Sequence, residues 1–283
     1  MKKTIALLAL IFAAAASAET IEYKTLYVND DGVITRKNSA SVLKAPLGVG
    51  VSYATHATPF GKVDSKEASL LLDYNFSGGS VFGSLGVGEL EGRSYFVGDT
   101  SIRFSPVKDV IAEVTVFGDT IISNASPVKT PYYGVMANTE FSNNGMGIVV
   151  GTRSIRYTDN NTQNGYHMRV WASIADGVVV FAKYRGYSNS LPFSPNYFSP
   201  DKYHRGGFGV TVRHRIGDTR LSATAENAKI NSAGNSEDVV AWKLQTDTKL
   251  SKSTSFVISA GKDYGLSGGF EYRYAEVKLK MEF

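Results

Sequence analysis

The chain has 283 residues, a formal net charge of +4 and no cysteine. Without cysteine it can form no disulfide scaffold, cysteine nucleophile or thiolate metal site. Because 20% of the residues are charged and 12% are aromatic, we exclude a disordered chain. The small, scattered excess of positive charge gives no support to nucleic-acid binding, so we expect soluble domains or one large barrel.

The first segment, residues 1–18, has the three parts of a bacterial secretory signal peptide. Lys2 and Lys3 form a basic start, an apolar run follows over residues 4–15, and small residues occupy positions 16–18. The run is shorter than the ~20 apolar residues of a membrane-spanning helix. We therefore expect a cleaved signal at residues 1–18 and one domain at residues 19–283, with an uncleaved anchor as the alternative.

No later stretch suits a transmembrane helix. The longest apolar runs, such as residues 177–182, are followed by charged residues within a few positions. The remaining choices are a protein that is soluble outside the cytoplasm and a transmembrane barrel.

Polar and apolar residues alternate with a period of two in many stretches, such as residues 109–120 and 275–283. This is the period of a β-strand. Residues 36–44 show it most weakly, so we predict sixteen strands, with fourteen as the alternative. In chain order the predicted strands span residues 20–29, 36–44, 46–56, 68–76, 80–89, 94–105, 109–120, 133–142, 146–157, 165–175, 178–188, 205–216, 218–228, 238–250, 254–264 and 270–283.

The predicted connections alternate between short and long. The short ones are rich in Gly, Asn, Asp and Ser, which adopt the dihedral angles of tight hairpins. They lie at residues 106–108, 143–145, 176–177, 217–218 and 251–253, and the long ones lie at 121–132, 159–164, 188–204 and 229–237. Short periplasmic turns alternate with longer extracellular loops in outer-membrane barrels, so this order favours a membrane barrel.

The last predicted strand ends at the aromatic residue Phe283, with Leu279 and Met281 on the same apolar face. Together with the signal peptide, this ending resembles the C-terminal signal of bacterial outer-membrane barrel proteins. The resemblance implies an all-β, transmembrane, antiparallel up-and-down barrel in the bacterial outer membrane. Its partners would be lipid, lipopolysaccharide and the barrel-assembly machinery. Sixteen strands enclose a lumen wide enough for water.

The polar face of each strand is expected to line this lumen. The cations among these residues gather on neighbouring strands from Arg169 to Lys249. They either favour anionic or polar solutes or pair with acids to stiffen the wall. The predicted inward charges are Asp73, Asp99, Arg103, Glu113, Glu140, Arg169, Lys183, Arg185, Arg213, Arg215, Arg220, Glu226, Lys243, Asp247, Lys249, Glu276, Lys278, Lys280 and Glu282. Inward aromatic residues, among them Phe117 and Trp171, either stack on sugar rings or belong to the girdles at the rims.

The longest predicted loop, residues 188–204, contains three prolines and four aromatic residues. Proline restricts the chain, so we expect this loop to fold inward as a constriction. Its spacing of Pro and Tyr or Phe is similar to a segment of the C-terminal barrels of the cellulose and poly-N-acetylglucosamine export porins. That resemblance implies passage of a polysaccharide. Those exporters also carry a periplasmic helical-repeat region, which is missing here, so a separate periplasmic delivery protein would be needed.

The histidines give little support to catalysis. His56, His167, His204 and His214 lie in no nucleophile elbow and show no His-x-x-x-His spacing. We expect no enzyme, no metal and no cofactor. A surface enzyme or adhesin anchored by a barrel, with His56 or His204 as the residue to test, stays as an alternative.

The sequence thus favours an outer-membrane channel that passes polar solutes, above all a saccharide chain, and the alternative is a general or nutrient-uptake porin. Selection would come from loop constriction, charge and stacking. We expect stacking by Trp171, Phe181, Tyr187, Tyr197, Phe198 and Tyr203, and hydroxyl or anion contacts by Lys183, Arg185, Arg213 and Arg215.

Overall fold

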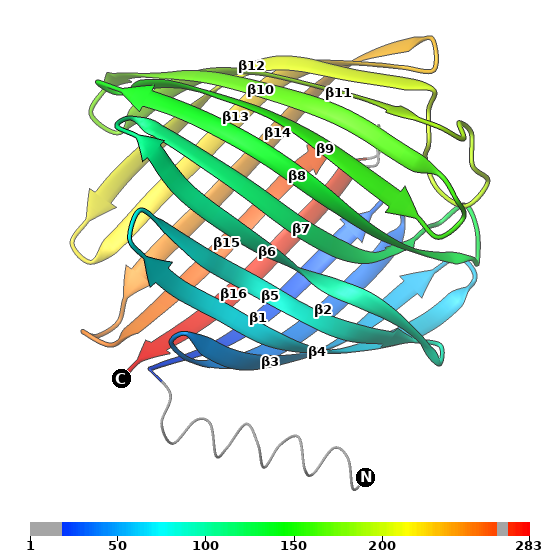
Figure 1. Cartoon of the computed structure of the whole chain (residues 1–283), viewed down its shortest axis with the longest axis horizontal. Helices are drawn as coiled ribbons and strands as arrows, with labels where there is room; N and C mark the ends of the chain where they lie inside the picture. Colours follow the sequence, from blue (N-terminus) through cyan, green and yellow to red (C-terminus); the bar gives the residue numbers. More distant parts are fainter. Residues whose placement is uncertain (1–18, 265–270) are drawn as a thin grey trace, which may run out of the picture.

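The computed structural model describes residues 19–264 and 271–283, which form one closed antiparallel barrel (Figure 1). Each strand is hydrogen-bonded to its neighbours in chain order, and β1 closes the barrel on β16. Closure leaves no unpaired edge, so every strand can satisfy its backbone within the barrel. The predicted all-β, up-and-down barrel is confirmed. The predicted signal peptide at residues 1–18 lies outside the described residues.

The described part of the chain contains sixteen strands, as predicted, and the weak stretch at residues 36–44 belongs to one of them. The strands are β1 (Thr20–Asp30), β2 (Val33–Lys44), β3 (Leu47–Thr58), β4 (Gly61–Phe76), β5 (Gly79–Leu90), β6 (Arg93–Val107), β7 (Val110–Ile122), β8 (Lys129–Asn143), β9 (Met146–Tyr157), β10 (Thr162–Ala175), β11 (Val178–Asn189), β12 (Lys202–Ile216), β13 (Thr219–Ser232), β14 (Asn235–Lys249), β15 (Thr254–Tyr264) and β16 (Glu271–Glu282).

Several strands run further than the sequence predicted, so the long connections are shorter. Only Ala233 and Gly234 separate β13 from β14, where we expected a loop over residues 229–237. Both residues have positive φ, as a tight hairpin turn requires. The expectation was wrong because polar residues outside a bilayer can continue a strand, and composition alone does not reveal this.

The two ends of the barrel differ. At the end that holds the strand termini, the backbone N–H of Phe283 donates to the carbonyl of Glu19 at 3.0 Å, and most turns have two residues, as at 176–177 and 217–218. The longest connections of the described chain, residues 123–128 and 190–201, lie at the opposite end. Outer-membrane barrels have short turns on the periplasmic side. We therefore call the end with the termini periplasmic and the other end extracellular.

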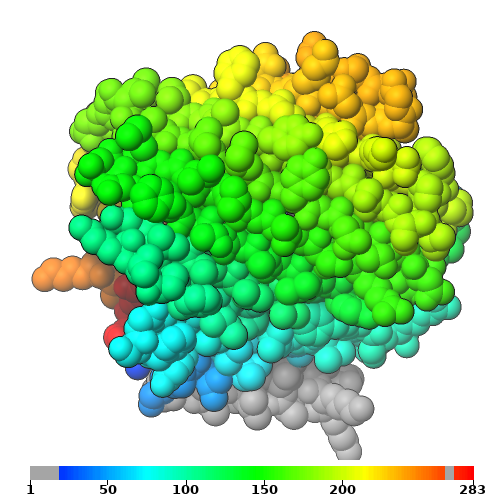
Figure 2. All heavy atoms as spheres, turned by 45° about the horizontal axis from the view of Figure 1, so that its top comes forward, coloured from blue at the N-terminus to red at the C-terminus, as the bar shows by residue number. Residues whose placement is uncertain are grey.

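The outer face is apolar. Outward positions expose large side chains such as Val116, Phe141 and Val150. The space-filling view shows neighbouring strands packed side by side over one face of the barrel (Figure 2). A soluble protein rarely exposes so broad an apolar surface, whereas lipid contact requires one. Leu279 and Met281 lie on this face, in register with Tyr23 and Ile21 of β1. No helix in residues 19–264 and 271–283 is long and apolar enough to cross a membrane.

Candidate functional site: the barrel lumen

The lumen contains two cavities that follow one another along the barrel. The larger, about 1160 Å³, lies in the periplasmic half and is lined by residues of β10 to β16 and the β10–β11 turn. The smaller, about 730 Å³, lies mainly beside β1 to β4 and β6 to β9 in the extracellular half. Asp263 and Tyr272 line both. The charges expected on the inner face lie there: Arg169 opposes Lys183 in register, and Arg103 opposes and binds Glu113.

A buried ion network lies on the wall where the two cavities approach each other. Arg205 of β12 is 1% exposed and donates to Glu226 of β13 at 2.9 Å and to Asp263 of β15 at 2.8 Å. Lys183 of β11 also pairs with Glu226. The intervening strands carry the short inward residues Ala228 and Ala241, which leave room for the guanidinium to lie along the wall. Because each buried charge has a partner, the network holds four strands in one arrangement.

Arg185 extends this network toward the extracellular side. Its Nη2 donates to the carbonyl oxygen of Tyr264 at 2.8 Å, which joins β11 to β15. The same guanidinium lies over the ring of Tyr203, 5.6 Å from its centroid. In this structure Arg185 therefore contacts the wall itself, and its expected contact with a substrate stays a prediction.

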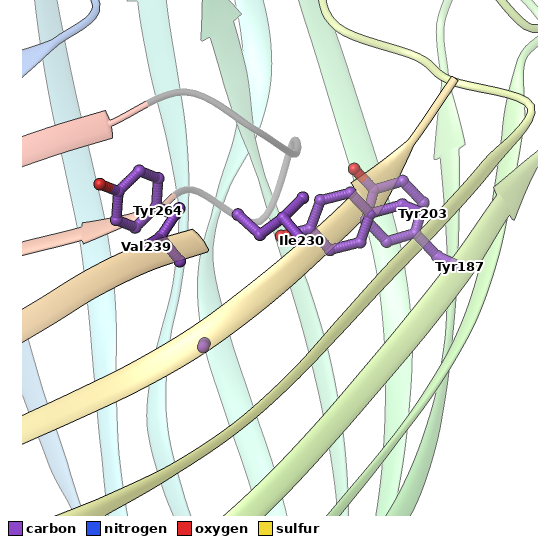
Figure 3. Close-up of a cluster of buried hydrophobic side chains, with 6 residues drawn as sticks. Tyr187, Tyr203, Ile230, Val239 and Tyr264 are labelled. Atoms are coloured by element: carbon purple, nitrogen blue, oxygen red, sulfur yellow. The ribbon is translucent and has the colours of Figure 1, made fainter. Parts of the chain in front are cut away.

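Above the network, aromatic and aliphatic side chains form a packed cluster on β11 to β15 (Figure 3). The rings of Tyr187 and Tyr203 stack with centroids 4.6 Å apart. Ile230, Val239 and Tyr264 complete the group, and Phe198 packs against it from the β11–β12 loop. Tyr203 is fully buried. These faces are therefore covered by one another in the present conformation.

The β11–β12 loop, residues 190–201, is held by hydrogen bonds to the β9–β10 connection, residues 158–161. Buried Asn161 accepts from the N–H of Leu191 at 2.9 Å and donates to the hydroxyl of Tyr197 at 2.9 Å. That hydroxyl donates to Asp159 at 3.1 Å, and the ring stacks on Tyr157 with centroids 4.7 Å apart. Burial raises the pKa of the Tyr197 phenol, so it stays a neutral donor.

A second loop, residues 123–128, reaches across the extracellular mouth. Asn124 donates its side-chain amide to the backbone oxygen of Asp31 at 2.6 Å and to its carboxylate at 2.9 Å. Asp31 lies in the β1–β2 turn, and four strands, β3 to β6, lie between this hairpin and the β7–β8 hairpin that carries Asn124. Ser126 of the same loop donates to Asn196 of the β11–β12 loop at 3.0 Å. We call this chain of contacts the mouth bridge.

The residues predicted to contact a substrate fall into two groups. Arg213 and Arg215 are exposed and line the larger cavity. Trp171 is half-buried, and its ring packs against Gly147 of the neighbouring strand. Phe198 is half-buried, and Lys183 lines the larger cavity while pairing with Glu226. Tyr187, Tyr197 and Tyr203 are buried near the extracellular end, Phe181 is buried against Gly209, and Arg185 is half-buried. Their role on a substrate path stays a prediction.

Four residues of the site were not predicted from the sequence: Arg205, Asp263, Asn124 and Asn161. Alternation along β12 could have placed Arg205 on the lumen side, because Tyr203, Arg213 and Arg215 lie on the same face of the strand. Nothing local marks Asn124 or Asn161, because their partners are 93 and 36 residues away.

The histidines offer no clear catalytic arrangement. His56 lies on the lumen side of β3, where its ring nitrogens meet Thr35 at 2.9 Å and Ser65 at 3.0 Å. Ser65 is 3% exposed, and the hydrogen-bond partners of the ring are hydroxyls rather than a carboxylate. The described residues contain no group of His, Asp and Glu able to hold a metal ion. His204 faces outward and bonds to Tyr184 at 2.9 Å.

Comparison with known proteins agrees with this architecture. No family model matches the sequence, and neither does any curated protein. Among solved structures, a bacterial polysaccharide outer membrane secretin superposes with a TM-score of 0.70 at 10% identity, over 94% of this chain and 99% of its own. The outer membrane protein OprD from Pseudomonas aeruginosa, with a TM-score of 0.45 at 9% identity over 94% of this chain and 93% of its own, is more distant.

The chain is a bacterial outer-membrane β-barrel with a porin-like architecture. The closed sheet, the apolar outer wall and the polar lumen define this class. At 10% identity, the likeness to the polysaccharide secretin concerns the fold.

Proposed function

We propose that this protein is an outer-membrane channel that passes a saccharide chain through its lumen. The observation that carries the proposal is the larger cavity, about 1160 Å³, whose wall combines arginine, lysine, serine and threonine side chains with the half-buried rings of Tyr272 and Tyr274. Hydroxyl-rich solutes need such hydrogen-bonding groups in a wet lumen. The fold shared with a polysaccharide outer membrane secretin supports this substrate class.

The mouth bridge and the aromatic cluster suit a regulated channel better than a permanently open pore. They lie at the extracellular end, where the lumen holds a cavity of about 730 Å³, against about 1160 Å³ in the periplasmic half. A polymer that enters from the periplasm would displace loops 123–128 and 190–201 on its way out. The buried faces of Tyr187 and Tyr203 would then become available for stacking. A periplasmic delivery protein, as in the resemblance to export porins, would supply the polymer.

The test is single-channel conductance of the folded protein in a planar bilayer, with maltohexaose added on either side. We expect low conductance with brief openings that maltohexaose shortens when it is added from the periplasmic side. Asn143→Ala, a change in a periplasmic turn, is the control for handling and folding. A steady, large conductance that maltohexaose never affects would instead identify a general porin. An activity that depends on the outer loops while the lumen never conducts would favour an anchored surface enzyme or adhesin.

A further inference from the structure

The larger cavity carries an unusual set of inward cations. Five basic side chains are exposed to the lumen and line or border it: Arg169 on β10, Arg213 and Arg215 on β12, Arg220 on β13 and Lys243 on β14. None of the five takes part in an ion pair within residues 19–264 and 271–283. We call them the basic wall.

Two of these cations oppose each other. Arg215 and Arg220 are direct partners in the β12–β13 register, on the same face of the sheet. Like charges in such positions destabilise a strand pair. Among the described residues neither arginine forms an ion pair, and Arg215 donates to the backbone oxygen of Gly217 at 3.0 Å. Opposed arginines without a carboxylate partner are typical of a surface that binds a negatively charged ligand.

The acids near the basic wall do not neutralise it. Glu226 and Asp263 line the same cavity but are already bound to Arg205, and Glu226 also binds Lys183. Asp176 and Asp247 are the other two carboxylates of the cavity. Asp247 faces Arg220 in register without forming an ion pair of 4.0 Å or less. The basic wall therefore keeps a positive excess.

The opposite side of the lumen carries negative charge. Asp73 on β4 and Asp99 on β6 are exposed on the inner face, and Glu140 on β8 is partly exposed there. None of them has an ion-pair partner among the described residues. An anionic solute would be repelled from this side and attracted to the other, so it would follow the strands β10 to β14.

The spacing of the cations favours a chain with repeated charges over a single small ion. The cations lie on β10, β12, β13 and β14, and neighbouring strands are ~4.8 Å apart. Arg169 is held in place by the rings of Phe181 and Trp171, with its guanidinium 4.8 Å and 5.9 Å from their centroids. A row of guanidiniums held in this way can bind carboxylates that are spaced along a chain.

We propose that the saccharide carried by this channel is anionic, with carboxylates spaced along the chain, and that the basic wall binds it on the periplasmic side. This inference rests on the proposed function, whose substrate class it specifies. It assigns Arg213, Arg215 and Arg220 as the entry contacts, with Lys243 and Arg169 further along the wall.

The experiment is isothermal titration of the full-length folded barrel at low salt with a hyaluronan hexasaccharide. The matched ligand is the same hexasaccharide with its carboxyl groups converted to methyl esters. We expect the charged form to bind at least about ten-fold more tightly, and its affinity to fall as salt is added. The double variant Arg213→Glu/Arg220→Glu should lose at least about ten-fold in affinity. Lys108→Glu, the same charge change in a periplasmic turn outside the cavity, should bind as the wild type does.

The outcomes separate this inference from the proposed function. Equal binding of the charged and esterified hexasaccharides, unchanged in the double variant, would overturn the anionic class and leave a saccharide channel. Inorganic phosphate binding as tightly as the charged hexasaccharide would show a small-anion site and overturn the polymer. Absence of binding by all three ligands would overturn the inference. The proposed function would still be decided separately, by whether maltohexaose blocks the conductance in planar bilayers. If Arg213→Glu/Arg220→Glu does not fold, Arg213→Gln/Arg220→Gln gives the same test with a smaller change.

Discussion

Arg205 of β12 and Asp263 of β15 form a 2.8 Å ion pair although two whole strands, β13 and β14, lie between them. The pair runs along the inner wall rather than between adjacent strands, and Glu226 shares the same guanidinium. Such a long-range link needs short side chains beneath it, and Ala228 and Ala241 provide them. It stabilises the wall where the larger periplasmic cavity meets the smaller extracellular one.

Removing Arg205 should therefore destabilise the barrel strongly. Arg205→Met leaves Glu226, which is 5% exposed, with one cation fewer, and we expect the free energy of unfolding to fall by about 3 kcal/mol. The measurement is urea unfolding of the folded barrel in lipid vesicles, followed by tryptophan fluorescence. Arg103→Met is the control, because its pair with Glu113 is half exposed and should contribute under about 1 kcal/mol. Equal losses in the two variants would contradict a special role for the buried network.

The mouth bridge should control opening. Asn124→Ala removes both hydrogen bonds to Asp31, so loop 123–128 loses its anchor on the far side of the mouth. We expect longer and more frequent openings in a planar bilayer. Asn143→Ala removes only a 3.4 Å contact to Asp109 in a periplasmic turn, and its conductance should match the wild type. Unchanged gating in Asn124→Ala would show that the bridge does not keep the mouth closed.

Tyr197 should separate the effect of hydrogen bonding from that of stacking. Tyr197→Phe keeps the stack on Tyr157 but deprives buried Asn161 and Asp159 of a partner. Tyr197→Ala loses both, so openings should increase in the order wild type, Phe variant, Ala variant. Because burial raises the pKa of Tyr197, this order should not change between neutral and mildly alkaline pH. Gating that shifts with pH over that range in the wild type, but not in Tyr197→Phe, would indicate that this phenol ionises.

Close packing on the inner wall predicts a difference between two nearby glycines. A Cβ at Gly209 would collide with the ring of Phe181 and the carbonyl oxygen of Ala225, whereas one at Gly206 would meet only Tyr184 at 3.4 Å. We expect Gly209→Ala to lower the free energy of unfolding by about 1–3 kcal/mol, as overpacking does. Gly206→Ala should change it little. The same urea titration checks both, and similar values would show that Phe181 can move away.

The barrel itself could be predicted because its signals are local. Two-residue periodicity gives the strands and the inward face, and that parity correctly places residues such as Arg169 and Lys183 on the lumen side. The turn residues at 176–177 and 217–218 mark strand ends. Periodicity failed where polar residues continued β13 and β14 beyond the expected bilayer, because their solvent contact hides the alternation.

The contacts between distant strands and loops could not be predicted in the same way. Contacts such as Asn124 with Asp31 or Arg205 with Asp263 depend on which strands face each other around the barrel. The loop composition at residues 190–201 indicated an inward fold, but it did not show that Tyr197 would pack on Tyr157. For the same reason the sequence could not show that the expected stacking residues would cover one another.

The most direct test of the central claim is saccharide flux in osmotic swelling of proteoliposomes. The compared proteins are the wild type and the variant Asn124→Ala/Tyr197→Ala, which loses the hydrogen bonds of Asn124 to Asp31 and the contacts of Tyr197 with Asn161, Asp159 and Tyr157. The account predicts that maltohexaose enters rapidly through the variant and slowly through the wild type, while both proteins are equally folded. A variant that conducts small ions but never admits maltohexaose would contradict passage of a saccharide chain.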